Sequence, residues 1–102
     1  MYLVQVLLPL YDNRGHRFSH PEFGSIRAEL TAKFGGATAY MRAPAEGTWE
    51  DSAGHVHHDD VFVMEVMTES LDREWWSAYR IGLTARFRQI EVVVRALPMT
   101  TL

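Results

Sequence analysis

The sequence predicts an α+β domain in which a four-stranded antiparallel sheet carries two helices on one face. Four short apolar segments have the length of strands, and two longer segments repeat apolar residues at helical spacing. They follow one another in the order strand, helix, strand, strand, helix, strand. A chain of 102 residues is the size of one domain, so we expect residues 1–102 to form a single unit.

The first strand and the first helix have clear boundary signals. Residues 2–8 are nearly continuously apolar, as in a central strand that is covered on both faces. Ser19 and Glu22 have the spacing of a capping box, and Gly35 provides a stop for a helix between them. One face of this helix is apolar, with Phe23, Ile26, Leu30 and Phe34, whereas Glu29 and Lys33 form a favourable pair on its outside.

The middle of the chain predicts two strands separated by a hairpin. Residues 37–43 alternate between apolar and polar side chains, and residues 61–67 are apolar except for one acid. Between them, residues 48–50 and 55–57 flank the turn-forming sequence 51–54, which indicates a hairpin extension.

The last third predicts the second helix and the fourth strand. Asp72 is the expected cap of a helix that runs to about Arg88, and residues 90–97 alternate as a strand. Trp75 and Trp76 are adjacent on the helix, so only one of them can face the core. With the first and third strands central, the result is a ferredoxin-like β-α-β-β-α-β arrangement with a hairpin between strands 2 and 3.

Composition excludes several classes of protein. The net charge of −3 disfavours nucleic-acid binding, and the lack of cysteine removes disulfides, thiolate ligands and thiol nucleophiles. The apolar start of the chain is too short to cross a membrane and has no cleavage signal. No phosphate loop, dinucleotide fingerprint or nucleophile elbow occurs. We therefore expect a cytoplasmic protein with no cofactor, no membrane association and no nucleic-acid partner.

The sheet face without helices is the most informative prediction. Alternation places an apolar centre and a few polar groups on this face, namely Leu3, Gln5, Leu7, Thr38, Tyr40, Arg42, Val61, Val63, Glu65, Met67, Glu91, Val93 and Arg95. Such a face should not remain in water. Either two copies stack their sheets as a homodimer, with Glu65 paired to Arg42 or Arg95, or the face is partly a small-molecule pocket. The ion-paired dimer interface is the favoured alternative, and the two are compatible, because dimers of this fold can enclose a cavity.

Candidate site residues follow from these alternatives. The predicted ligand-binding residues are Tyr40, Arg42, Trp49, Glu65 and Arg95. The candidate acids and bases are Glu65 in its apolar strand, His20 beside the first helix cap, and His57. His55, His57 and Asp59 would point the same way on a strand, as metal ligands do. We nevertheless predict no metal site, because neighbouring residues lack a distant closing ligand unless His16 or His20 supplies one.

Two short motifs carry a family resemblance. The run from Phe34 to Tyr40 (Phe-Gly-Gly-Ala-Thr-Ala-Tyr), followed by Gly47-Thr48-Trp49 and Gly54, resembles a pattern in small bacterial ferredoxin-like proteins without an assigned activity. The resemblance implies the fold and no reaction. More loosely, the layout is similar to amino-acid-sensing regulatory domains and to dimeric α+β barrel proteins, which include cofactor-independent oxygenases and isomerases.

The favoured function is a homo-oligomeric domain, with a homodimer expected, that binds a small molecule or a protein partner on the helix-free face. The alternative is a small cofactor-independent enzyme of the dimeric α+β barrel type, with a histidine base and an arginine that orients an anionic substrate. The sequence does not decide whether the protein is an enzyme.

Overall fold

A computed structural model describes residues 1–41, 47–50, 56–59, 61–89 and 91–102. The elements in chain order are β1 (Tyr2–Pro9), α1 (His20–Phe34), β2 (Thr38–Met41), β3 (Gly47–Glu50), β4 (Val56–Asp59), β5 (Val61–Thr68), α2 (Arg73–Arg86) and β6 (Val93–Pro98). One sheet has the order β2-β5-β1-β6, and β3 pairs with β4 in a second, two-stranded sheet. All pairings are antiparallel. The predicted α+β class, with an antiparallel sheet and two helices, is confirmed.

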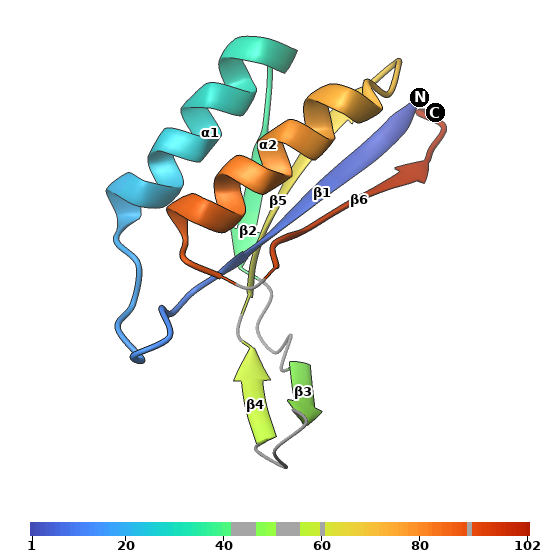
Figure 1. Cartoon of the computed structure of the whole chain (residues 1–102). Helices are drawn as coiled ribbons and strands as arrows, with labels where there is room; N and C mark the ends of the chain where they lie inside the picture. Colours follow the sequence, from blue (N-terminus) through green and yellow to red (C-terminus); the bar gives the residue numbers. More distant parts are fainter. Residues whose placement is uncertain (42–46, 51–55, 60, 90) are drawn as a thin grey trace.

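Both helices cover the same face of the main sheet, as Figure 1 shows. The buried core lies between that face and the helices. Its members are alternate residues of β1 and β5, the apolar stripes of the helices and three residues that adjoin the elements: Val4, Val6, Leu8, Leu10, Phe23, Ile26, Leu30, Met64, Val66, Trp76, Leu83, Phe87 and Val92. Because side chains alternate along a strand, the intervening residues of β1 and β5 lie on the opposite, helix-free face.

The predicted boundaries of α1 are confirmed. The Glu22 carboxylate accepts hydrogen bonds from the Ser19 backbone N–H (2.6 Å) and from the Ser19 hydroxyl (3.0 Å). At the other end Gly35 has a φ of 80°, the left-handed conformation that glycine adopts without steric cost. Its N–H donates to the Thr31 carbonyl (2.8 Å), so the last turn is closed.

The end of α2 and the start of β6 correct the sequence prediction. The helix begins at its predicted cap, where the Asp72 carboxylate accepts from the Trp75 N–H (3.1 Å), but it ends at Arg86. Arg88 has a φ of 51°, which turns the chain back toward the sheet. The strand then begins at Val93, not at residue 90, because the Val92 N–H donates to the Thr84 hydroxyl (3.3 Å). The prediction for residue 90 itself lies outside the described residues.

The two adjacent tryptophans divide between core and edge, as expected. Trp76 is buried at 5% exposure and stacks on Phe34, with ring centroids 5.1 Å apart. Trp75 is half-buried and stacks on Tyr79 at 4.9 Å. Lys33 lies over the Trp75 ring, 4.7 Å from its centroid, and thus covers this edge.

The predicted hairpin is present as the β3–β4 pair, in which Trp49 lies opposite His57. The predicted turn and His55 lie outside the described residues. Within the described residues, neither helix is long and apolar enough to span a bilayer.

Candidate functional site

The helix-free face of the main sheet consists of three rows of side chains that run across β5, β1 and β6. The strand register places Gln5 opposite both Glu65 and Arg95. On either side of this polar row, Leu3 lies between Met67 and Leu97, and Leu7 lies between Val63 and Val93. The face therefore has one polar row between two apolar rows.

The polar row is a hydrogen-bonded chain. Gln5 Nε2 donates to Glu65 Oε2 (2.8 Å), and Arg95 Nε donates to Gln5 Oε1 (2.7 Å). Gln5 is buried, with 7% exposure. Both functions of the amide are thus satisfied, as a buried amide requires. Thr38 of β2 lies opposite Glu65 and extends the row to the sheet edge.

Within one chain, Gln5 joins Glu65 to Arg95 through hydrogen bonds, and the predicted pairing of these charges across a dimer interface remains a prediction. The two residues are on strands separated by β1, and the Gln5 amide connects them. Arg42, the other predicted partner, lies outside the described residues. Tyr40 shares this end of the sheet, because its backbone pairs with Val63.

The two apolar rows are open to solvent only in part, because Val63 is buried at 2% exposure and Leu3 and Leu7 are half-buried. Met67 is 58% exposed, Val93 44% and Leu97 43%. These three residues come from both outer strands of the three-strand face, so the exposed apolar surface flanks the polar row. An apolar surface around a fixed polar group is typical of interfaces and ligand sites.

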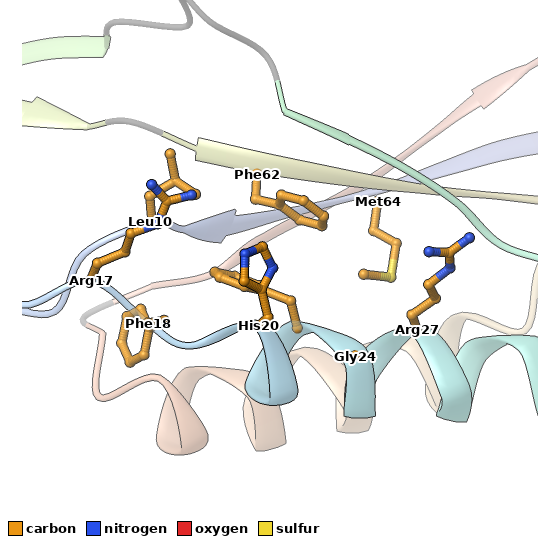
Figure 2. A pocket seen from close by; sticks show the side chains of 9 residues that line it. Leu10, Arg17, Phe18, His20, Gly24, Arg27, Phe62 and Met64 are labelled. Carbon is orange, nitrogen blue, oxygen red and sulfur yellow. The ribbon is translucent and has the colours of Figure 1, made fainter.

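A separate cleft lies on the helix side, between α1 and the beginning of β5 (Figure 2). Its volume is about 150 Å³. Figure 2 shows the Phe62 and Met64 side chains on one wall and His20 and Arg27 of α1 opposite them, whereas Arg17 lies at one end. His20, a candidate base, is therefore a cleft residue at the start of α1, and it is exposed.

The sequence prediction missed Arg17, Gly24 and Arg27 as members of this cleft. A glycine within a helix was the available signal, because glycine weakens a helix unless its missing side chain has a use. The three candidate acids and bases are on separate elements, with His20 in α1, His57 in β4 and Glu65 in β5. The predicted role of each as a catalytic residue remains a prediction.

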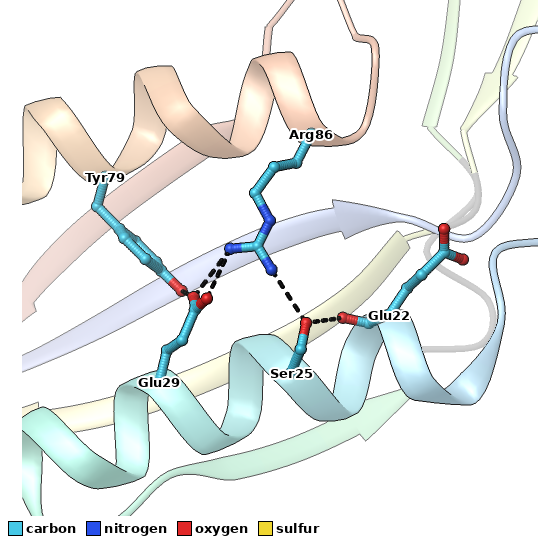
Figure 3. Close-up of polar contacts among 5 residues, drawn as sticks. All are labelled: Glu22, Ser25, Glu29, Tyr79 and Arg86. Carbon is cyan, nitrogen blue, oxygen red and sulfur yellow. Dashed lines mark hydrogen bonds and ion pairs between the residues drawn. The ribbon is translucent and has the colours of Figure 1, made fainter.

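The two helices are linked by a polar cluster on their outer surface (Figure 3). Glu29 of α1 accepts hydrogen bonds from the Tyr79 hydroxyl (2.7 Å) and from Arg86 Nη1 (2.9 Å). Arg86 Nη2 also donates to the Ser25 hydroxyl (3.0 Å). Partial burial raises the pKa of Glu29, but the hydrogen bonds from Tyr79 and Arg86 lower it further, and the net pKa is below the ordinary value. Glu29 thus interacts with Tyr79 and Arg86 of α2 and not with Lys33, the partner that the sequence predicted on its own helix.

No group of three or more metal-ligating side chains comes together within the described residues. His57 and Asp59 belong to β4, whereas His55 is outside the described part of the chain. The sequence-based expectation about metal binding remains a prediction.

The fold of this α+β chain is similar to that of two solved structures of phage SAM lyase. It matches a phage SAM lyase in complex with S-methyl-5'-thioadenosine, with a TM-score of 0.66 and 14% identity over 94% of this chain and 79% of that chain. The apo form of a phage SAM lyase matches with a TM-score of 0.60 and 13% identity, over 94% and 78% of the two chains. At this identity the likeness shows the fold alone.

No protein-family model matches the sequence, and no curated protein matches it. Neither sequence comparison therefore supports the motif resemblance to small bacterial proteins. The likeness that was found is structural, and it is to the phage enzymes.

Proposed function

We propose that this protein is a homo-oligomer that binds a nucleoside thioether or sulfonium on its helix-free face. The observation that carries the proposal is the Arg95–Gln5–Glu65 chain, a fixed polar row within an otherwise apolar surface. A small-molecule site of this type combines apolar walls with a few oriented polar groups. The strand order β2-β5-β1-β6 is that expected for a ferredoxin-like domain, and the proposal includes this fold for the main sheet.

The apolar rows favour association. Met67, Val93 and Leu97 are each more than 40% exposed, and they lie on the same face. In a small domain, covering such a surface with a second copy contributes a favourable free energy of about 25 cal/mol for each Å² of apolar area. Stacking of two sheets through this face, as in the predicted homodimer, is the simplest arrangement, and the ligand would then lie in a cavity enclosed between the two sheets.

The polar row supports an adenosine-type compound as the ligand. An adenosine-type ligand has a flat ring for the apolar rows and ribose hydroxyls that can pair with a carboxylate, an amide or a guanidinium. The structurally similar phage enzyme was seen with S-methyl-5'-thioadenosine, a ligand of this class. The predicted set of Tyr40, Arg42, Trp49, Glu65 and Arg95 remains the candidate ligand-binding set.

Calorimetric titration with S-methyl-5'-thioadenosine and with SAM tests the proposal. The sulfur of SAM is a cationic sulfonium, whereas the thioether is neutral. At about 5 Å and an effective dielectric constant of about 20, a carboxylate attracts a unit positive charge by about 3 kcal/mol. After solvent screening, we expect Glu65→Gln to weaken SAM binding by about tenfold and to affect the thioether less.

Glu69→Gln is the matched control, because Glu69 is exposed just after β5 and its loss changes the net charge equally. Equal effects of the two variants on both ligands would show a general charge effect and contradict the assigned site.

Light scattering of the wild type and of Val93→Glu tests association separately. A monomeric wild type would contradict the proposed oligomer. The proposed ligand would then be tested by the calorimetric titration alone.

A SAM-degrading activity is the second candidate, and the likeness to the phage lyases favours it. Glu65 is the carboxylate of the polar row and would be the acid or base. Chromatography of SAM incubated with the protein would reveal S-methyl-5'-thioadenosine as a product. If wild type and Glu65→Gln give the same rate as buffer, the protein binds without turnover.

A further inference from the structure

The cleft between α1 and β5 lies on the helix side of the sheet, away from the proposed nucleoside site. We propose that this cleft binds a small carboxylate with a flat or branched apolar group. Three properties of the cleft support this assignment: a glycine in its helical wall, its basic residues, and its apolar wall on β5.

The glycine is Gly24, in the second turn of α1. Glycine in a helix interior costs about 1 kcal/mol relative to alanine. A Cβ built on Gly24 would meet no heavy atom within 4 Å, so the packing of the protein itself does not require glycine here. Because Gly24 lines the cleft, its missing side chain leaves the space beside the helix open to a ligand.

The charged residues among the described lining of the cleft are basic. Arg17, His20 and Arg27 line it, and no acidic residue is among the described residues that do so. Within the described part of the chain, Arg27 and His20 make no hydrogen bond or ion pair. Figure 2 shows His20 between the two arginines along the cleft. A guanidinium and an imidazole together offer N–H donors suited to a carboxylate.

The opposite wall is apolar. Phe62 and Met64 extend from β5, and the Phe23 ring stacks on Phe62 with centroids 4.8 Å apart. A cleft of about 150 Å³ has the size of the cavities that hold one six-membered ring. The combination of this wall with the charged wall selects an apolar acid rather than a sugar or a polyphosphate.

Nuclear magnetic resonance titration of the 15N-labelled protein tests the proposal. The probes are phenylacetate, indole-3-acetate and 4-methylvalerate, and each is compared with its primary amide. We expect at least one acid to shift the backbone signals of residues 18–27 and of Phe62, and to bind about tenfold more tightly than its amide.

Gly24→Leu fills the cleft and is the decisive variant. It should abolish binding of the acid without lowering the melting temperature, since leucine favours a helix and its Cβ meets no atom. Gly82→Leu is the matched control, because Gly82 is exposed in α2 and its added Cβ also meets no atom. Arg27→Gln should reduce the preference for the acid over its amide and leave binding of the amide unchanged.

Each contrary result overturns the assignment. If none of the acids shifts the cleft signals, the cleft is not a site for this class of ligand. If acid and amide bind equally, the positive charge has no role in recognition. If Gly24→Leu binds as well as Gly82→Leu, the ligand is bound elsewhere on the molecule.

Discussion

Removing the Tyr79 hydroxyl should measure how strongly the polar cluster joins the two helices. Tyr79→Phe keeps the ring that stacks on Trp75, with an interplanar angle of 13°, and deletes only the hydrogen bond to Glu29. A hydrogen bond to a charged acceptor contributes about 1.5–3 kcal/mol. The Glu29 side chain is 44% exposed, so solvent screening reduces this value. We expect a loss of about 1 kcal/mol, or a fall in melting temperature of about 4–8 °C for a domain of this size.

The loss should depend on pH in one direction. The pKa of Glu29 is lowered by folding, so the folded state favours its carboxylate form. A group with a lowered pKa stabilises the fold above its unfolded value, here near the ordinary 4.5, and this contribution is lost as the pH falls through the folded value. The Tyr79 hydroxyl is protonated at neutral pH even at its ordinary pKa of 10.0, and burial, and then the Glu29 carboxylate, raise that pKa further. The difference between wild type and Tyr79→Phe should therefore be largest at neutral pH and decrease in acid.

Urea unfolding followed by circular dichroism at a fixed protein concentration provides the measurement. The cycle of wild type, Tyr79→Phe, Glu29→Ala and the double variant isolates the contact between the two side chains, because alanine leaves no acceptor for the hydroxyl. We expect the two substitutions to be non-additive. If the free energies of unfolding add within error, or if the effect of Tyr79→Phe is the same at pH 3 and pH 7, the hydrogen bond contributes nothing and the reasoning is refuted.

Three further substitutions address the caps and the core. Gly35→Ala should cost about 1 kcal/mol in thermal unfolding, because the φ of 80° disfavours a side chain; an unchanged melting temperature would mean that the helix end rearranges. Asp72→Ala should cost about 1 kcal/mol by losing the cap on the Trp75 N–H, and Asp72→Asn, measured in the same urea titration, should recover most of it. Met64→Ala should cost about 2–5 kcal/mol, since Met64 is 0% exposed; a smaller loss in chemical unfolding would indicate that the core collapses around the space.

Local signals in the sequence were sufficient for most of the fold. Ser19, Glu22 and Gly35 placed both ends of α1 because caps and left-handed stops depend on neighbouring residues alone. Alternation likewise placed Gln5 and Glu65 on the same face. The start of β6 was missed because Val92 has the residue type of a strand. Its backbone N–H donates to the hydroxyl of Thr84, eight residues earlier, and not to a neighbouring strand.

Contacts between distant residues account for the other differences. Glu29 and Lys33 have ideal spacing for a helical pair, worth about 0.2–0.5 kcal/mol, and a tyrosine with an arginine from the other helix is a stronger set of partners. The Gln5 bridge was missed for a related reason. Sequence can identify opposite charges on two strands, but it does not show that a neutral amide on the strand between them connects the two.

The polar row has a direction, and that direction limits the symmetry that a pair of stacked sheets can adopt. Glu65 is at one end and Arg95 at the other, separated by one strand, or about 10 Å. A two-fold axis parallel to the strands reverses the row in the second copy and places each carboxylate over a guanidinium. A two-fold axis parallel to the row places like charges over each other, which is unfavourable. The placement of Glu65 on β5 and Arg95 on β6, on either side of β1, thus selects between two dimers that would bury the same apolar residues.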